Sequence, residues 1–310
     1  MANPGAAPNT VVTSIRQVVK RGFYAGQRNV ARLHTWLTPR STRKFALFVL
    51  HAIAPAKSDM AVSPSRFRRQ LAALLSAGYR CLDFDEVLQA IQEPGSLQSP
   101  AFGLTFDDGY RSVYEDAWPV VEELGVSATI FVTVNFLEGK VAPPWYSSDT
   151  ALVREYAEHA AQFRPLEWPQ LREMARSKRI RIGSHSLNHH LMGRLDETTL
   201  RHDLQRSKHI LEDRLGVPVS LFSYPFGVAR YGAYSRASED VVRQMGFRCS
   251  CTSEIGRIRA GSGNPYLLPR ISLVEEDTGL DARAKAAGAY DWIGLAQSAF
   301  QRIFPNPHDG

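Results

Sequence analysis

The chain has 310 residues, of which 44% are hydrophobic and 22% charged, and it carries a formal net charge of +6. This composition is typical of a globular protein and excludes an intrinsically disordered chain. No apolar run approaches the roughly 20 residues that span a bilayer, and the N-terminus lacks the apolar stretch of a secretory signal. The three cysteines cannot all pair, which favours reduced thiols. We therefore expect a cytoplasmic protein.

The positive charge is concentrated before the first acidic residue, Asp59. Nine of the 37 Lys and Arg residues precede it, so the remaining 28 are outnumbered by the 31 acidic residues. Between Val11 and Phe23, apolar residues recur at helical spacing with basic residues opposite, which predicts a basic amphipathic helix. Such a helix could pack on the core or bind a partner, which we favour slightly, or lie on an anionic membrane surface. Nucleic-acid binding is not expected, because no recognition motif accompanies the charge.

Strands and helices alternate from residue 45 onward. The patterns predict strands at 45–51, 79–84, 102–106, 128–134, 180–185, 221–227 with its turn, 247–252 and 267–273. They predict helices at about 64–78, 85–92, 112–124, 148–162, 168–177, 196–215, 239–245 and 280–304. Glycines suited to helix ends recur at Gly78, Gly125, Gly216 and Gly246. This alternation implies a parallel sheet, either closed as a barrel or open and doubly wound.

Two adjacent carboxylates end the apolar run of Phe102–Phe106, in the stretch Thr105-Phe106-Asp107-Asp108-Gly109. Carboxylates that share a site repel each other, so both stay ionised only if a cation or a strong donor offsets one of them. A strand end followed by an ordinary Asp-Gly turn explains the same residues about equally well.

Two imidazoles stand four residues apart in His185-Ser186-Leu187-Asn188-His189, at the end of another predicted strand. At this spacing they can meet on one face of a helical turn, and Asp108 would complete a metal site of two histidines and one carboxylate. A bound cation would neutralise Asp108 and leave Asp107 free as a base. One such pair among nine histidines means little alone. Both motifs stand at the ends of predicted strands, however, and this coincidence favours a shared site.

These two motifs resemble the first and second motifs of the NodB-homology polysaccharide deacetylases, carbohydrate esterase family four, and Ser223-Tyr224-Pro225-Phe226-Gly227 is similar to the third. The resemblance covers about Phe45 to Leu273. It implies a distorted (β/α) barrel of about seven parallel strands, a divalent metal and hydrolysis of N-acetyl groups on amino sugars. By position it makes Asp107 the catalytic base and Asp108, His185 and His189 the metal ligands. Zinc is the expected metal, with cobalt and nickel as alternatives.

Two departures from the family pattern concern the neighbours of the base. The third motif usually begins with an Arg that pairs with the base, and here Ser223 stands in its place. No Leu-x-His motif follows near the C-terminus, but Val49-Leu50-His51 is similar to the shifted motif of the exopolysaccharide deacetylase subgroup. His51 is therefore our candidate general acid, and Arg270 our candidate partner of Asp107. The alternatives are a hydrogen-bonded histidine at a strand end and a surface ion pair.

The third motif also implies contacts with the substrate. The backbone N–H of Phe226 would stabilise the oxyanion, and Tyr224 would lie near the substrate. Trp145 and Tyr146 could offer an aromatic face to a sugar ring or could anchor a loop.

The motifs together predict a metal-dependent N-deacetylase of an N-acetylglucosamine-like sugar in a polysaccharide or lipid-linked glycan. The alternatives are a catalytically inactive carbohydrate-binding homologue and a deacetylase or deformylase of a small or lipid-carried sugar. The predicted division is a basic segment at 1–44, a deacetylase domain at 45–275 and a helical extension at 276–310. The basic segment would hold the enzyme at the inner membrane face.

Overall fold

The computed structural model describes residues 41–55, 60–142 and 160–303. The strands in these ranges are β1 (Lys44–Leu50), β2 (Ala52–Ile53), β3 (Ala61–Val62), β4 (Arg80–Leu82), β5 (Ala101–Phe106), β6 (Ala128–Val132), β7 (Ile180–Ser184), β8 (Leu221–Ser223), β9 (Cys249–Cys251), β10 (Ile258–Arg259) and β11 (Ile271–Ser272). The α-helices are α2 (Pro64–Ser76), α3 (Phe84–Gln92), α4 (Trp118–Leu124), α5 (Val134–Leu137), α7 (Trp168–Ala175), α8 (Glu197–Leu215), α9 (Arg236–Gln244), α10 (Gly279–Ala287) and α11 (Asp291–Ile303). Shorter helical segments are η1 (Val113–Ala117), η2 (Ala160–Phe163), η3 (Met192–Arg194) and η4 (Ala229–Tyr231). The predicted amphipathic helix between Val11 and Phe23 lies outside the described residues.

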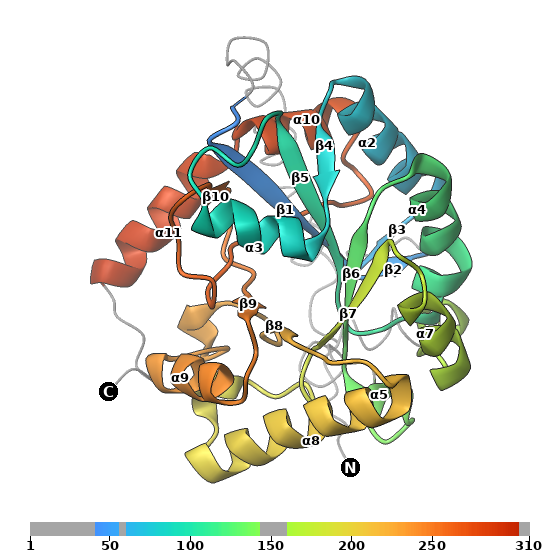
Figure 1. Ribbon diagram of the computed structural model, residues 1–310, viewed down its shortest axis with the longest axis vertical. Coiled ribbons are helices and arrows are strands. Elements are labelled where there is room, and N and C mark those ends of the chain that lie inside the picture. Colours follow the sequence, from blue (N-terminus) through green and yellow to red (C-terminus); the bar gives the residue numbers. More distant parts are fainter. Residues whose placement is uncertain (1–40, 56–59, 143–159, 304–310) are drawn as a thin grey trace, which may run out of the picture.

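The main sheet is mostly parallel and curls around on itself, with helices on its outside (Figure 1). Its strands follow the order β10-β1-β5-β6-β7-β8-β9, while β4 pairs with β5 and β11 with β1. Only β10 among these pairs antiparallel to its neighbour in the described sheet. Leu268 forms a parallel bridge with Cys251 of β9, and the chain then pairs with β1 through β11, so residues 268–272 close the gap between β9 and β1. The predicted distorted (β/α) barrel is confirmed.

Alternation along the strands divides the core into an outer and an inner part. Phe102 and Phe106 of β5 face outward and pack beneath the surrounding helices. Leu47 and Phe131 face inward and pack with the apolar face of α3, which crosses in front of the strands in Figure 1. Gly183 makes room for this inner layer, because a Cβ there would lie 2.5 Å from the ring of Phe131. Each large apolar side chain buried in this way stabilises the fold by about 1.5–3 kcal/mol.

The helix ends follow the sequence signals. Asp83 caps α3 through a capping box, and Asp196 caps α8. Because Asp83 begins the helix, β4 ends earlier than predicted. Gly125 and Gly216 end α4 and α8 in the left-handed conformation, with φ of 67° and 69°. Ser63 precedes α2 as predicted, but its hydroxyl binds the carboxylate of Glu275 (2.9 Å) and does not cap the helix.

Within the described ranges, three predicted elements differ from the structure by more than their end residues, and the helix predicted at 148–162 lies almost wholly outside those ranges. The strand predicted at 267–273 shrinks to β11, because Pro269 has no N–H to donate to a ladder. The helix predicted at 280–304 is broken into α10 and α11 by Gly288, whose φ is 100°. The helix predicted at 112–124 begins with the π-helical turn η1.

The first of the two C-terminal helices, α10, and the turn before it are joined to the rest of the fold through buried polar contacts. The side-chain amide of Gln70 in α2 donates to the carbonyl oxygens of Val274 and Asp277 (both 2.9 Å). The ammonium of Lys285 in α10 donates to the Asp277 carboxylate (2.5 Å) and to the carbonyl of Ser272 (2.7 Å). The predicted boundary at residue 275 stays a prediction. No helix in the described ranges has the length and hydropathy needed to cross a membrane.

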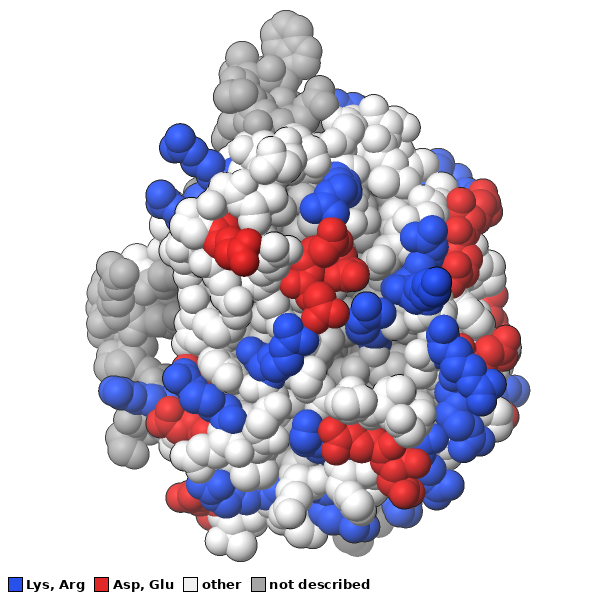
Figure 2. Space-filling model, viewed as in Figure 1, with Lys and Arg blue, Asp and Glu red and all other residues white. Residues whose placement is uncertain are grey.

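Charges of both signs are interspersed over the face on which α3 lies (Figure 2). Arg80 pairs there with Glu86, and Arg248 with Asp85 at 2.7 Å. Exposed pairs of this kind contribute little to stability, and they are typical of a solvated surface.

Candidate metal centre and active site

The acidic pair stands where β5 leaves the sheet, with its two carboxylates pointing to different partners. Asp107 continues the inward-facing row of β5 and forms a backbone hydrogen bond to the carbonyl of Leu50 (3.0 Å). Asp108 adopts the left-handed conformation, with φ of 73°, which turns its side chain away from the strand direction. Its carbonyl accepts from the N–H of Thr133 at the end of β6 (3.1 Å). Both side chains are buried.

The two histidines follow β7 in an irregular turn, so the predicted helical turn is wrong. Ser186 and His189 have φ of 71° and 58°, which no α-helix allows. The hydroxyl of Ser186 accepts from the N–H of His189 (2.8 Å), and the carbonyls of Ser186 and Leu187 accept from the backbone after β6 (3.3 and 3.0 Å). The strained residues are therefore fixed by neighbouring strand ends, and the rings still meet, with centroids 4.9 Å apart.

Asp108, His185 and His189 together form a candidate metal site. The Oδ1 atom of Asp108 lies 3.5 Å from the Nε2 atom of each histidine, and all three atoms lie within 4.8 Å of one another. These separations are too long for hydrogen bonds, but tetrahedral ligands at zinc distances stand about 3.4 Å apart. Asp108 Oδ1 is buried and has no hydrogen-bond partner in the described structure. A cation would satisfy this orphaned acceptor, so the residues fit a divalent metal.

The protonation of His185 also suits a metal ligand. Its Nδ1 atom lies 2.8 Å from the carbonyl oxygen of Ser223, which can only accept, so Nδ1 carries the proton and Nε2 has a free lone pair. Burial lowers the pKa of His185 to about 4, although Asp107 and Asp108 oppose this effect. The ring is therefore neutral at pH 7. Burial raises the pKa of Asp108, but His189 and the other two nearby histidines outweigh it and hold that pKa below its ordinary value.

Asp107 is held by a buried guanidinium from Arg270, just before β11, which pairs with the neighbour of β5, β1. Nη1 and Nη2 of Arg270 each donate to one carboxylate oxygen of Asp107, both at 2.7 Å. Arg270 Nη2 also donates to the hydroxyl of Ser223 (2.9 Å), and its Nε to the carbonyl of Thr252 (2.8 Å). Burial raises the pKa of Asp107, but Arg270 outweighs it and keeps the carboxyl ionised.

This fork-shaped contact is the one expected from the sequence, and the surface alternative for Arg270 is wrong because its side chain is fully buried. Arg270 lies in the segment that closes the barrel, between Leu268 and β11, so it can reach Asp107 from beside β9. A small residue at position 223 leaves room for the guanidinium. The role of Arg270 in catalysis stays a prediction.

His51 and Phe226 lie at the rim of the same site. His51 directly follows β1 and is half-buried, and its charge contributes to lowering the pKa of both Asp107 and Asp108. Phe226 has a φ of 62°, and its ring packs edge-on against His189 with centroids 4.6 Å apart. Among the described residues, the Phe226 N–H has no hydrogen-bond acceptor. Both groups are thus near the metal ligands, while their roles as acid and oxyanion donor stay predictions.

Tyr224 must be corrected. Its side chain is fully buried in an outer cluster, packed against Phe222 with ring centroids 5.2 Å apart. Alternation along the chain points Ser223 inward and its neighbour outward, so the Tyr224 side chain cannot contact a substrate in this arrangement. Trp145 and Tyr146 lie outside the described residues.

Asp203 of α8 supports the histidine turn and was not predicted from the sequence. Its carboxylate accepts from the backbone N–H of Leu187 (2.7 Å) and lies 3.4 Å from the side-chain nitrogen of Asn188. It is buried in the row formed by Leu200, Leu204 and other inward residues of the helix. The sequence does carry one signal for Asp203, namely an aspartate within an apolar row of a helix. A carboxylate buried there needs strong hydrogen-bond donors.

We expect Asp203→Ala to weaken zinc binding about 10–100-fold, because losing this acceptor frees a turn that holds two strained residues. Equilibrium dialysis against zinc with a competing chelator would measure the change. Asp213→Ala, an exposed position on the same helix, is the matched control and should bind zinc like the wild type. Equal zinc affinity for both variants would show that the turn does not depend on Asp203.

A comparison with protein-family models finds a match that spans much of this site. The family model described as "Polysaccharide deacetylase" matches residues 95–250, just over half of the chain. The matched range contains Asp107, Asp108, His185 and His189, but neither His51 nor Arg270.

Relatives are distant but cover much of the chain. YxkH of Bacillus subtilis (strain 168), named after the same family, is 24% identical over 255 residues, covering 82% of this chain and 78% of that protein. The poly-beta-1,6-N-acetyl-D-glucosamine N-deacetylase of Escherichia coli (strain K12) is 29% identical over 131 residues, which cover 42% of this chain but only 18% of that protein. The structure of the Streptococcus pyogenes deacetylase PplD in complex with acetate has a TM-score of 0.64 at 21% identity, covering 78% of this chain and 98% of that chain. This last likeness supports the fold.

Proposed function

The chain belongs to the polysaccharide deacetylase family, and we propose that it is a metal-dependent hydrolase that removes N-acetyl groups from an N-acetylglucosamine-like sugar in a glycan. The observation that carries this proposal is the pairing of Asp107 with Arg270 directly beside Asp108, His185 and His189. A pure binding protein has no need for an ionised carboxylate next to a metal site. The name of the Escherichia coli relative supports a β-1,6-linked poly-N-acetylglucosamine as the first substrate to test.

Asp108, His185 and His189 would hold the metal, which supplies Lewis-acid polarisation of the amide carbonyl. Asp107, oriented by Arg270, accepts a proton from the attacking water.

Two further groups act at the rim. The Phe226 N–H, which has no other acceptor in the described structure, donates to the oxygen on which negative charge develops. His51 donates a proton to the leaving amine, because an unprotonated amide nitrogen is a very poor leaving group.

Zinc is the metal we propose. Two imidazoles and one carboxylate with open positions are a common zinc set, and cobalt or nickel would accept the same donors. Elemental analysis of the purified chain would identify the metal that it carries.

We propose that the enzyme works in the cytoplasm, at the inner face of the membrane, where a lipid-linked glycan would be within reach. The support is the run of basic residues before Asp59, which an anionic lipid surface would attract. Cell fractionation with an antibody against the chain would test this location.

The test of the activity is incubation with N-acetylated β-1,6-glucosamine oligomers and with chito-oligosaccharides, followed by mass spectrometry for the loss of each acetyl group. We expect acetate release that stops on treatment with a chelator and returns when zinc is added. Full activity after exhaustive chelation would contradict the metal mechanism.

The second candidate is an inactive carbohydrate-binding homologue, favoured by Ser223 in place of the family's usual Arg. Binding of the same oligomers without any acetate release, in protein with its full metal content, would favour this candidate.

A further inference from the structure

The C-terminal helix α11 has an apolar face that the fold leaves open. Trp292, Leu295, Ala296 and Ala299 recur at the spacing of one helix face, and all four are exposed. The exposed fractions are 54% for Trp292 and 71% for Leu295. We call these four residues the α11 stripe.

The opposite face of α11 is the one that packs on the barrel. The backbone of Gly294 lies so close to Ile255 that a Cβ would come within 2.0 Å of its carbonyl oxygen. The side chain of Gln297 accepts from the N–H of Ile255 (3.0 Å), and Ile293 packs with the small cluster around Tyr290. The α11 stripe is therefore not the face by which α11 packs on the barrel, because the opposite face already makes that contact.

The first residue of α11 lies beside the point where the basic segment enters the fold. The ammonium of Lys44, at the start of β1, is 3.3 Å from the carboxylate of Asp291, which also pairs with Arg257 (2.9 Å). Arg43 and Arg259 are exposed here and pair with no carboxylate among the described residues. In Figure 2, basic side chains project from the upper left edge, where β1 begins in Figure 1. Asp291 thus pairs with two cations, and two further arginines lie in or next to the adjoining strands β1 and β10, so this corner carries a net positive charge.

We infer that the α11 stripe and this basic corner form one docking surface for an anionic lipid membrane. An apolar helix face flanked by positive charge is the combination that binds at a lipid interface, and a tryptophan is well suited to the headgroup level. The other basic residues before Asp59 would add to the attraction through their charge. The inference rests on the proposed membrane location and assigns to it a second contact within the folded part of the chain.

A second copy of the chain fits the α11 stripe less well. A stable dimer needs about 800 Å² of buried surface on each partner, whereas a tryptophan buries at most about 250 Å² and the stripe adds one leucine and two alanines. Two positive corners would also face each other in a symmetric pair. A fluid lipid surface needs no such shape match.

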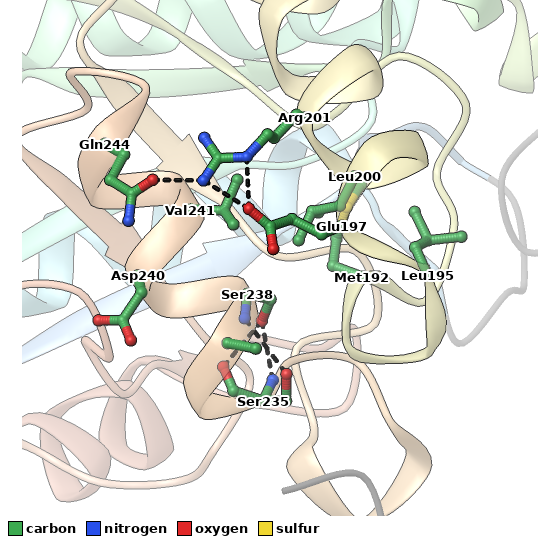
Figure 3. A pocket seen from close by; sticks show the side chains of 11 residues that line it. Met192, Leu195, Glu197, Leu200, Arg201, Ser235, Ser238, Asp240, Val241 and Gln244 are labelled. Atoms are coloured by element: carbon green, nitrogen blue, oxygen red, sulfur yellow. Dashed lines mark hydrogen bonds and ion pairs between the residues drawn. The ribbon is translucent and has the colours of Figure 1, made fainter.

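A pocket elsewhere in the described structure gives weaker evidence for a ligand than this surface does. A pocket of about 260 Å³ between α8 and α9 has apolar walls from Met192, Leu200 and Val241 (Figure 3). The guanidinium of Arg201 at its rim is already engaged, since it donates to both Glu197 (2.7 Å) and Gln244 (2.5 Å). Nothing in it identifies an occupant.

The test is co-sedimentation of the full chain with vesicles of phosphatidylcholine alone or mixed with phosphatidylglycerol. We expect binding to the anionic vesicles, and a loss of about tenfold or more in the double variant Trp292→Ser/Leu295→Ser. Val217→Ser removes a comparably exposed apolar residue after α8 and should bind like the wild type. Acetate release from soluble oligomers should be the same for all three proteins, so this assay reports separately on the proposed function.

Three results would overturn the inference. One is no binding of the wild type to anionic vesicles, and another is equal binding of the wild type and the double variant. The third is a wild-type dimer in light scattering that the double variant dissociates, because the α11 stripe would then be a contact between two copies.

Discussion

Asp107→Asn should lower kcat for acetate release by about 10²–10⁴-fold while leaving zinc affinity unchanged. The substitution keeps the shape of the side chain but removes the charge that accepts a proton. It does not touch the three atoms of the metal site, because those belong to Asp108, His185 and His189. Single-turnover acetate release together with zinc content would measure both quantities on one sample.

The neighbouring residue is the matched control. Asp108→Asn makes the same chemical change one position along, but it weakens the ligand that both histidines face at 3.5 Å. We expect this variant to lose zinc and to lose activity as a consequence, with partial recovery at high zinc concentration. If Asp107→Asn lost the metal, or if Asp108→Asn kept both metal and activity, the proposed division between base and ligand would be wrong.

The convergence of the site could be predicted because it follows from topology. Asp107 and His185 lie at the carboxyl ends of strands, and in a parallel barrel all these ends meet at one rim. Glycines such as Gly125 and Gly216 marked the helix ends, since the left-handed conformation strongly favours them. These signals are local, and a single sequence carries them.

The conformation of the histidine turn could not be predicted. A spacing of four residues fits a helical turn, yet Ser186 and His189 adopt positive φ. The hydrogen bonds that hold them come from α8 and from the backbone after β6, both far away along the chain. Propensity alone gives no hint of contacts that form only in the folded barrel.

Tyr224 shows a different limit. Resemblance to a motif placed it near the substrate, but a motif gives only the order of residues. The direction of each side chain depends on the register of β8, in which Ser223 contacts Arg270 inside the barrel. Its neighbour must then point to the outer core.

The position of Arg270 illustrates how one interaction can be rebuilt from another strand. Asp107 requires a buried cation, since an isolated carboxylate in this interior would take up a proton. The resemblance of the motif predicts such a cation at position 223, on β8, whereas here the cation comes from the segment between β9 and β1. Both positions border Asp107, because Ser223 and Arg270 contact each other as well as the carboxylate. The position of the guanidinium against Asp107 is thus more constrained than the segment of the chain that supplies it.

Removing the guanidinium should therefore damage both stability and activity. We expect Arg270→Met to lower the free energy of unfolding by about 3–5 kcal/mol, because Asp107 would remain buried without its partner. Chemical denaturation would measure this loss. In the double variant Asp107→Asn/Arg270→Met part of the stability should return, since neither charge is then left unpaired.

Exchanging the residues at positions 223 and 270 tests whether the guanidinium itself matters or the segment that supplies it. Ser223→Arg combined with Arg270→Ser moves the guanidinium to β8 while keeping the composition of the site constant. We expect this exchanged variant to release acetate faster than Arg270→Ser alone, and to be more stable than it, because Asp107 regains a fork-shaped partner. Wild-type stability and activity in Arg270→Ser would mean that the carboxylate needs no guanidinium, and the proposed role of Arg270 would then fail.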